Sequence, residues 1–262
     1  MRTRERITLD LKQKLEWVNQ IQWAPDGKQL ALSAVSNGTT DIYLTRPNGG
    51  DYRPLTSDIY DDLCPVWSAD GNAIYFASNR DTALGYRPRR ENWYYMFAQR
   101  KLDIYEITDL KEKRTIRRVT HTPFINETAP RRHAGQLLYL TDAGGVYNLA
   151  TTDTTGMLAP ITRYETGMYG LSPTGKRAVW GAYEQGRLSW RLSDTLDQQR
   201  RYPFRLAGAA LQAKDAYDRA EQLKRQAELK TIAPPPPPPK SQEPKVEPKP
   251  DEPPPPQEEK KD

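Results

Sequence analysis

The chain has 262 residues and a net charge of +5 at pH 7, and 36% of its residues are hydrophobic. So small a basic excess, without a recognisable RNA- or DNA-binding module, excludes nucleic acid as an expected partner. The single cysteine, Cys64, excludes an internal disulfide. Residues 1–14 lack the apolar run of a signal peptide or a membrane span, so an export signal, if the protein has one, is expected beyond this chain.

A short lead-in, residues 1–17, comes before a repeated turn motif. Residues 23–27 read WAPDG, and residues 67–71, which start 44 positions later, read WSADG. An apolar run follows each turn directly, which predicts a strand that begins after an Asp-Gly turn. The motif residues with an expected structural role are Trp23, Asp26, Gly27, Trp67, Asp70 and Gly71.

Each of the first two units has a third and a fourth predicted strand. The third strand begins with Asp-Ile-Tyr, from Asp41 to Tyr43 and from Asp103 to Tyr105, and the fourth ends in an apolar residue followed by threonine. A shorter third copy is predicted at residues 137–140, 145–147 and 161–162. A fourth copy is predicted to have its turn at residues 171–175 and strands at 178–180 and 188–190. Four short strands in each unit are typical of a propeller blade.

These motifs resemble the repeat of TolB-type β-propellers, in which Trp-Ser-Pro-Asp-Gly precedes an apolar strand, Ser-Asn-Arg-Asp, Asp-Ile-Tyr and Leu-Thr. Related repeats occur in the non-catalytic propellers of prolyl oligopeptidases. The resemblance spans residues 18–194 and is strongest in the first two units. We therefore predict an all-β body over residues 18–204, a β-propeller of about four four-stranded blades. Because neighbouring blades cover each other's faces, Trp23 and Trp67 are expected to wedge between blades.

The predicted number of blades does not decide whether the propeller forms a closed ring. Four blades do not readily close a ring, and TolB-type propellers typically have six. Either the chain is a fragment, or an upstream portion supplies further blades, or the assembly is an open sector with an exposed edge. We favour the fragment interpretation.

The second unit is longer than the first by 18 positions, because 32 positions separate Gly71 from Asp103 and 14 separate Gly27 from Asp41. The insert mixes aromatic and basic side chains, which dominate interface hot spots. As a hypothesis, a partner binds to Tyr86, Arg87, Arg89, Arg90, Trp93, Tyr94, Tyr95 and Phe97. The alternative is that the aromatic rings pack over the flank of the blade. Four further arginines either extend a basic patch or are scattered surface charge, namely Arg117, Arg118, Arg131 and Arg132.

From residue 205 to residue 232 the pattern changes to that of a helix. Apolar residues recur three and four positions apart, at Ala209, Ala213, Ala216, Ala220, Leu223 and Ala227. This narrow seam either docks on the propeller, pairs with another helix or stays solvated. Residues 234–262 contain 13 prolines and 12 charged residues, so residues 233–262 are expected to form a disordered, semi-rigid spacer.

No catalytic or metal-binding motif is visible in the sequence. Gly-x-Ser-x-Gly, His-Glu-x-x-His and cysteine pairs are absent, and the two histidines, His121 and His133, are expected at the surface or between blades. Turn chemistry explains the aspartates that precede glycine, and Asp61 and Asp62 are placed in the loop that enters the second blade. We therefore expect no catalytic residue, no metal and no cofactor.

The resemblance implies a periplasmic setting and protein or peptide ligands at the propeller face. Our leading hypothesis is a non-catalytic protein-interaction scaffold of the bacterial cell envelope, with the proline-rich tail as a spacer or tether. The competing hypothesis is the accessory propeller of a larger peptidase whose catalytic domain lies outside this chain. Neither the partner nor the oligomeric state is predicted.

Overall fold

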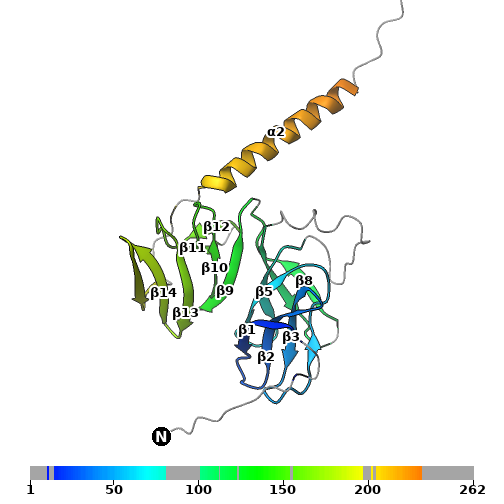
Figure 1. Ribbon diagram of the computed structural model, residues 1–262, viewed down its shortest axis with the longest axis vertical. Coiled ribbons are helices and arrows are strands. Elements are labelled where there is room, and N and C mark those ends of the chain that lie inside the picture. The colour runs from blue at the N-terminus through cyan, green and yellow to red at the C-terminus, as the bar shows by residue number, and fades with distance from the viewer. Residues whose placement is uncertain are drawn as a thin grey trace, which may run out of the picture. The chain divides into compact units, whose positions relative to one another are not determined.

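The computed structural model describes residues 11, 15–80, 101–111, 113–122, 124–153, 156–196, 202 and 205–231. They form four antiparallel sheets and one long helix, α2 (Gly208–Thr231). The chain divides into two compact units, Met1–Arg219, which holds the sheets, and Ala220–Asp262, whose described part is the end of α2. In the first unit the sheets stand beside one another in chain order (Figure 1), which confirms the predicted propeller architecture.

Consecutive strands pair in every sheet, so each sheet is an up-and-down blade. Blade 1 consists of β1 (Trp17–Trp23), β2 (Leu30–Ser36), β3 (Thr39–Thr45) and β4 (Arg53–Pro54). Blade 2 consists of β5 (Asp62–Trp67), β6 (Ile74–Ser78), β7 (Asp103–Thr108) and β8 (Thr115–Arg118). Blade 3 consists of β9 (Glu127–His133), β10 (Gln136–Thr141), β11 (Asn148–Thr152) and β12 (Leu158–Pro160).

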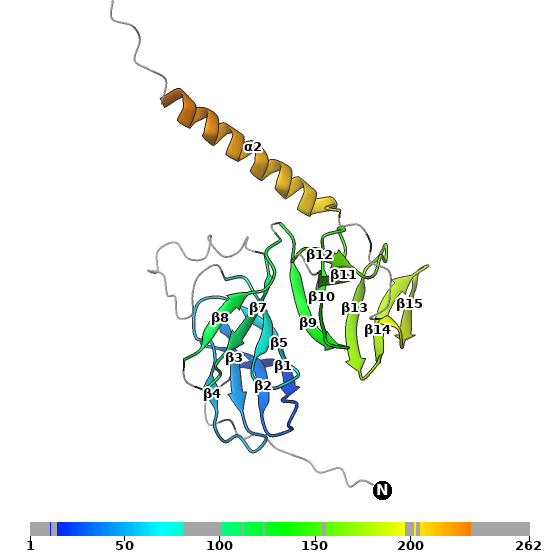
Figure 2. The ribbon, with the colours of Figure 1, turned by 180° about the vertical axis from the view of Figure 1, so that it is seen from behind.

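Blade 4 has three strands among the described residues, where the prediction was four. They are β13 (Met168–Thr174), β14 (Arg177–Glu184) and β15 (Arg187–Ser193). After β15 the chain returns toward blade 3, because the N–H of Tyr202 donates to the carbonyl of Pro160 at 2.8 Å. Figure 2 shows blade 4 from behind, with β15 at the outer edge of its sheet.

Two predicted segments of the weaker repeats are wrong in position. Residues 145–147, predicted as a strand, form part of the turn before β11, because Gly145 has a left-handed φ of 88° and its N–H donates to the carbonyl of Asp142 at 2.8 Å. Residues 171–174, predicted as a turn, belong to β13. The turn of that blade falls on Gly175, which has a φ of 58°. In both segments the position of the turn is set by the glycine that adopts a left-handed φ, which the sequence pattern alone does not identify.

The two Asp-Gly turns have the predicted chemistry. Gly27 and Gly71 have φ values of 70° and 75°, a region that favours glycine. The carboxylate of Asp26 accepts the N–H of Lys28 at 2.9 Å. Asp70 accepts the N–H of Asn72 at 3.2 Å and the hydroxyl of Ser68 at 2.5 Å, and the Ser68 hydrogen bond lowers the pKa of Asp70 to about 2.

A threonine bracket joins the fourth strand of a blade to its third strand. In blade 1 the N–H of Leu55 donates to the carbonyl of Ile42 at 2.7 Å, and the N–H of Ile42 donates to the hydroxyl of Thr56 at 2.9 Å. The same bracket recurs in blades 2 and 3 at Val119, Ile104 and Thr120, and at Ile161, Leu149 and Thr162. The predicted apolar residue followed by threonine is therefore the residue pair that closes each complete blade.

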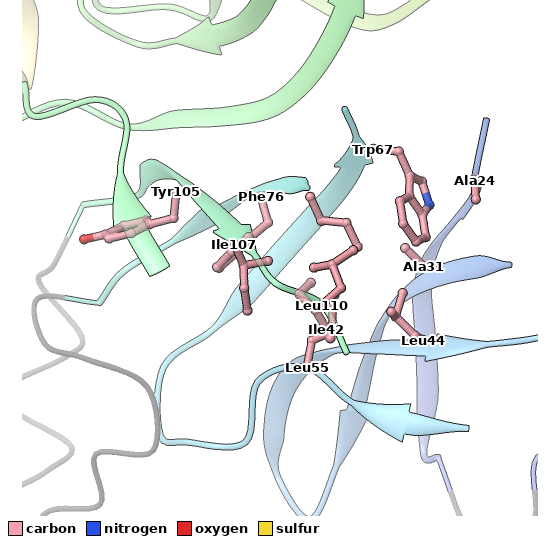
Figure 3. Packing of buried hydrophobic residues seen from close by; sticks show 11 residues of the cluster. Ala24, Ala31, Ile42, Leu44, Leu55, Trp67, Phe76, Tyr105, Ile107 and Leu110 are labelled. Atoms are coloured by element: carbon pink, nitrogen blue, oxygen red, sulfur yellow. The ribbon is translucent and has the colours of Figure 1, made fainter. Parts of the chain in front are cut away.

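Apolar side chains from blades 1 and 2 meet in a shared core around Trp67 (Figure 3). Trp67 is 5% exposed, and its indole N–H donates to the carbonyl of Gln22 at 3.3 Å, so the predicted wedge is confirmed. Trp23 is different, because it pairs with Leu30 on the other face of blade 1 and is 51% exposed. The prediction for Trp23 is wrong because no blade covers that face among the described residues, although Leu11 and Leu15 pack on part of it.

The helix meets blade 3 through its first turns. Ala210 is buried in a cluster with Ala143 and Leu158, and the ring of Tyr217 lies 5.4 Å from that of Phe124. The seam residues Ala209, Ala213 and Ala216 are exposed, as in the solvated alternative for this helix. The N–H of Ala207 donates to the carbonyl of Ala143 at 2.9 Å, and this bond fixes the turn that leads into α2.

Replacing Trp67 by alanine is expected to lower the free energy of unfolding by about 3–5 kcal/mol, because it leaves a cavity between two blades. Trp17→Ala serves as the control, since Trp17 is 67% exposed and its loss is expected to change stability by less than about 0.5 kcal/mol. Urea unfolding followed by circular dichroism measures both. Equal destabilisation by the two substitutions would contradict the assignment of Trp67 to the core.

Candidate interaction surface

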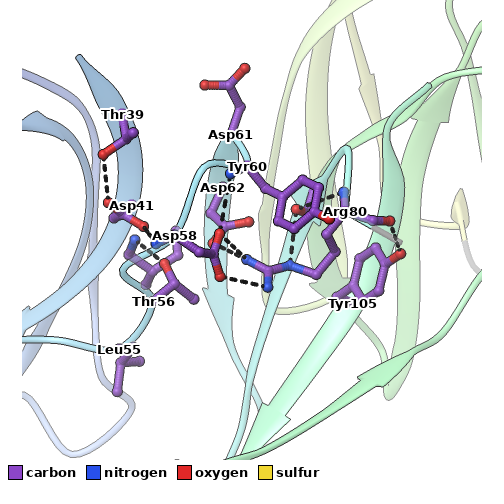
Figure 4. A network of polar contacts seen from close by, with 12 residues as sticks. Thr39, Asp41, Leu55, Thr56, Asp58, Tyr60, Asp61, Asp62, Arg80 and Tyr105 are labelled. Atoms are coloured by element: carbon purple, nitrogen blue, oxygen red, sulfur yellow. Dashed lines mark hydrogen bonds and ion pairs between the residues drawn. The ribbon is translucent and has the colours of Figure 1, made fainter. Parts of the chain in front are cut away.

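Equivalent positions of the repeat meet at each junction between neighbouring blades. At the first junction the third strand of blade 1 contributes Asp41, and the segment after β4 contributes Asp58. Blade 2 contributes Asp62, the first residue of β5, and Arg80, two positions after β6. All four side chains are buried. Figure 4 shows Arg80 aimed at the carboxylates of Asp58 and Asp62.

The guanidinium of Arg80 is the cation of this junction. Its Nη1 lies 3.0 Å from Asp58 Oδ2, its Nη2 donates to Asp62 Oδ2, and its Nε donates to the hydroxyl of Ser78 at 3.1 Å. The ring of Tyr60 lies 5.3 Å from the guanidinium carbon, within the range of a cation–π contact. One oxygen from each of Asp41, Asp58 and Asp62 lies within 4.8 Å of the other two, a spacing that could hold a metal ion. Here, however, Arg80 supplies the positive charge, so the cluster is an internal ion network.

Burial sets the protonation of this network. Desolvation raises the pKa of Asp62 to about 6, although the positive charge of Arg80 acts to lower it. The sequence analysis places Asp61 and Asp62 in one loop, but the structure separates them. Asp61 is exposed and bonds to Asn79, whereas Asp62 begins β5 inside the junction. Asp62 belongs to the strand because it pairs with Ser78 in the register of β5 and β6.

A hydrogen-bonded pair of one aspartate and one asparagine lies beside each of the first two junctions. The pair occupies equivalent positions in blades 2 and 3, but the aspartate and the asparagine are exchanged. In blade 2 the N–H of Asp61 donates to Asn79 Oδ1 at 3.0 Å, and Asn79 Nδ2 donates to Asp61 Oδ2 at 3.4 Å. In blade 3 the N–H of Asn126 donates to Asp142 Oδ1 at 2.6 Å, and Asn126 Nδ2 donates to Asp142 Oδ2 at 2.7 Å. Both bridges fasten the entry of the first strand to the end of the second.

The second and third junctions carry less charge than the first. At the third, Asn148 stands in place of Asp41, and its Oδ1 accepts the N–H of Tyr164 at 2.7 Å and the hydroxyl of Thr162 at 3.0 Å. Met168 begins the first strand of blade 4 there. At the second junction, Asp103 and Glu127 occupy the two acidic positions. Desolvation raises the pKa of Glu127 to about 7.

The other residues that the sequence singled out have internal partners. Tyr43 stacks on Tyr52 with ring centroids 5.3 Å apart, and the hydroxyl of Tyr105 donates to the carbonyl of Arg80 at 2.5 Å. The four arginines considered as a basic patch contact neighbouring residues, with Arg117 on Glu106, Arg118 on Asp103, Arg131 on the carbonyl of Leu171, and Arg132 over the ring of Tyr75. His133 is buried and His121 is exposed. The eight aromatic and basic residues proposed in the insert, from Tyr86 to Phe97, lie outside the described residues.

The outer face of blade 4 is an exposed apolar surface that sequence reasoning missed. The register places Val179 opposite Leu192, Gly181 opposite Trp190, and Tyr183 opposite Leu188. Side chains of residues directly opposite each other lie on one face of a sheet, and this face is exposed. Its apolar members are Tyr169 (40% exposed), Val179 (37%), Tyr183 (47%), Leu188 (54%), Trp190 (67%) and Leu192 (66%). We call this set the blade 4 outer face.

The opposite face of the same blade is covered. Trp180 is 4% exposed and packs with Leu171 and Leu149 in a cluster shared with blade 3. On the outer face, the ring of Tyr169 lies over Gly181, where a Cβ would come within 2.5 Å of that ring. The signal for the outer face was present in the sequence, because Leu188, Trp190 and Leu192 alternate with polar residues, as in a strand with one apolar face.

No protein-family model matches the chain. Among solved structures, the chain is similar to a putative TolB from Agrobacterium tumefaciens, with 20% identity and a TM-score of 0.55 over 74% of this chain and 67% of that one. It is also similar to TolB from Acinetobacter baumannii, with 19% identity and a TM-score of 0.52 over 70% of this chain and 42% of that one. The fold is that of a TolB-type β-propeller.

A puromycin hydrolase, solved as its S511A mutant in complex with PGG, contains a similar arrangement. It shares 16% identity with this chain, with a TM-score of 0.52 over 72% of this chain and 30% of the hydrolase. The chain thus spans 42% of the Acinetobacter TolB and a smaller share of the hydrolase. At these identities the likeness concerns the fold. Within the described residues, no helix is both long and apolar enough to cross a membrane.

Replacing Arg80 by methionine is expected to lower the free energy of unfolding by about 3–5 kcal/mol, because it leaves buried carboxylates without their cation. Adding Asp58→Asn and Asp62→Asn to that variant is expected to restore most of the loss, since it removes the uncompensated charges. Arg46→Met is the control, because the Arg46–Asp51 pair is more than half exposed and is expected to contribute less than about 1 kcal/mol. Chemical unfolding measures all three, and an Arg80→Met variant as stable as the control would contradict the assignment.

The raised pKa of Asp62 predicts a pH-dependent difference from the Asp62→Asn variant. The folded protein retains the proton of Asp62 up to about pH 6, whereas the unfolded chain releases it near 3.8. The folded state therefore binds more protons in between, and the contribution of Asp62 to the unfolding free energy falls as pH rises from about 4 to about 6. Unfolding of both proteins across this range measures the difference. Asp70→Asn is expected to show the opposite sign at lower pH, because the pKa of Asp70 is lowered to about 2 and its contribution to the unfolding free energy therefore rises as pH rises from about 2 to about 4.

Proposed function

We propose that this chain is a non-catalytic protein-interaction scaffold that binds an extended segment of a partner at the open side of blade 4. The observation that carries the proposal is the blade 4 outer face, where Leu188, Trp190 and Leu192 are each more than half exposed. Contiguous exposed apolar surface of this kind marks interaction sites in soluble proteins. The face belongs to a rigid sheet whose other side is packed against blade 3, so it is presented without rearrangement.

The free edge of β15 indicates the form of the partner. In blades 1, 2 and 3 the third strand pairs with a fourth strand, and a threonine bracket follows. Among the described residues β15 pairs only with β14. A strand edge with unpaired backbone groups accepts another strand through main-chain hydrogen bonds. The partner segment is therefore an extended peptide, and its alternate apolar side chains would continue the outer face beside Trp190 and Leu192.

We further propose a bacterial envelope setting, with the proline-rich residues 233–262 as a spacer. The likeness to TolB structures supports the setting. The composition of the spacer, with 13 prolines in residues 234–262, supports an extended connection to another part of the envelope. In this arrangement the propeller binds the partner, and the length of residues 233–262 sets the distance between the propeller and the part of the envelope to which the tail connects.

A second candidate function is the accessory propeller of a peptidase. The likeness to puromycin hydrolase, over 30% of that chain, favours it. The chain itself has no Gly-x-Ser-x-Gly or His-Glu-x-x-His sequence. Either sequence encoded in the same polypeptide would favour this second function, and peptide hydrolysis by the purified chain alone would overturn the non-catalytic assignment.

A synthetic eight-residue peptide that alternates valine and threonine is a suitable probe for the open edge. We expect it to bind the intact protein and to shift the tryptophan emission to shorter wavelength, because Trp190 becomes covered. Trp190→Lys is expected to weaken this binding by about tenfold or more, since a charge would enter the apolar contact. Fluorescence anisotropy of a labelled peptide measures the affinity.

Trp17→Lys is the matched control, because Trp17 and Trp190 are both 67% exposed and lie on different blades. The control is expected to bind the peptide as the unchanged protein does. An equal loss in the two variants, or no effect of Trp190→Lys, would contradict binding at blade 4.

A further inference from the structure

The second junction between blades repeats the acidic positions of the first but lacks its arginine. Register places Asp62 opposite Ser78 in blade 2 and Glu127 opposite Thr141 in blade 3, so Glu127 is the equivalent of Asp62. Two positions after these partners stand Arg80 and Ala143. Their N–H groups donate to the hydroxyls of Ser78 and Thr141 at the same distance of 3.3 Å, which confirms that Ala143 is the equivalent of Arg80.

The third-strand aspartate is kept at both junctions. Asp41 precedes Ile42, and Asp103 precedes Ile104, and each isoleucine N–H donates to the bracket threonine of its blade at 2.9 Å. The second junction therefore holds a carboxylate from each of two blades, as the first does. Alanine at position 143 offers no positive charge to balance them.

The carboxylates of the second junction are buried and short of partners. Glu127 is 0% exposed, and neither its Oε1 nor its Oε2 has a hydrogen-bond partner among the described residues. Asp103 is 4% exposed, and its Oδ1 is likewise unpartnered. Arg118 binds only the other oxygen of Asp103, Oδ2, and its side chain is 35% exposed. A buried carboxylate without a partner is costly, and a cation removes that cost.

The positive charge of Arg118 acts to lower the pKa of Glu127, but its guanidinium binds Asp103 and its side chain is 35% exposed. The hydroxyls of Thr120 and Thr122 lie beside Glu127 and act to lower its pKa, but neither makes a hydrogen bond of normal geometry with it. The negative charge of Asp103 acts in the opposite direction. His121 interacts with Asp103, and it is exposed. Carboxylate and hydroxyl oxygens from blades 2 and 3 therefore lie close to one another at this junction.

We propose that a calcium ion binds at the second junction between Glu127 and Asp103, in the role that the Arg80 guanidinium has at the first. Calcium takes six to eight oxygen ligands and accepts both oxygens of one carboxylate. Glu127 offers two such oxygens and Asp103 offers one, and Thr120 and Thr122 bring hydroxyl oxygens to the same place. The ion would join blade 2 to blade 3 as Arg80 joins blade 1 to blade 2.

The test uses the full chain after removal of metal with a chelator. At pH 8, where Glu127 is ionised, calorimetric titration with calcium chloride is expected to show one site that is half-saturated below about 1 mM. Calcium is also expected to raise the thermal unfolding midpoint. Glu127→Gln preserves the size of the side chain, removes its charge, and is expected to abolish both effects. The absence of calcium binding by the unchanged protein at this pH would overturn the proposal.

Asp62→Asn is the matched control, because it changes the equivalent acid at the junction that Arg80 already fills. It is expected to leave the calcium affinity unchanged. A second variant, Asp103→Asn, is expected to weaken calcium binding by about tenfold or more with an unchanged circular dichroism spectrum, and it keeps the test valid should Glu127→Gln fail to fold. Calcium binding that survives both Glu127→Gln and Asp103→Asn would place the ion elsewhere and overturn the site.

Discussion

Each blade of this chain has two apolar faces, and a blade buries them only against whatever stands beside it. Trp67 is covered because blade 1 lies against it, and Trp23 is half exposed because no blade among the described residues lies on its side. The same constraint accounts for blade 4, whose inner face is packed and whose outer face is not. The stability of blade 4 and the partner binding that we propose for it therefore have one origin, since a blade buries apolar surface only where a neighbour covers it.

The three junctions show how one geometry accommodates different chemistry. The first is held by a buried arginine between two aspartates, and the third by neutral hydrogen bonds around Asn148 and Tyr164. The second has buried carboxylates, and the cation that pairs with one of them among the described residues is the partly exposed Arg118. In each case the backbone bracket that ends in threonine is kept. The bracket thus sets the position of the junction, and the side chains around it set its charge.

Local chemistry made much of this fold predictable from sequence. The turns at Asp26 and Asp70, and the threonine that closes each complete blade, depend on hydrogen bonds to nearby positions or within one blade. The Arg80 network was not predictable in the same way, because its two acids are 18 and 22 positions away from Arg80 in the chain. They come together with Arg80 only when blades 1 and 2 pack against each other. Burial depends on neighbours too, so a motif that places Trp67 in the core left Trp23 exposed.

The candidate surface was missed for a different reason. Its alternating pattern at Leu188, Trp190 and Leu192 is visible in the sequence, but the same pattern describes any strand with one buried face. What distinguishes an exposed face from a covered one is the sheet itself, which among the described residues has three strands and leaves β15 paired only with β14. The insert from Tyr86 to Phe97, which the sequence favoured, lies outside the described residues.

The exchanged bridge of Asp61 with Asn79 and Asn126 with Asp142 bears on how these units diverged. Column by column, a self-alignment of the repeats scores two mismatches there, although the contact is preserved in both copies. The side-chain amide donor is at the second position in blade 2 and at the first position in blade 3, and the carboxylate acceptor is at the other position in each. This exchange requires substitutions at both positions of one copy. What is preserved between the two copies is therefore the contacting pair of residues, not the residue type at either position. Internal repeats this degraded are better detected by comparing paired positions across the copies than by matching letters in order.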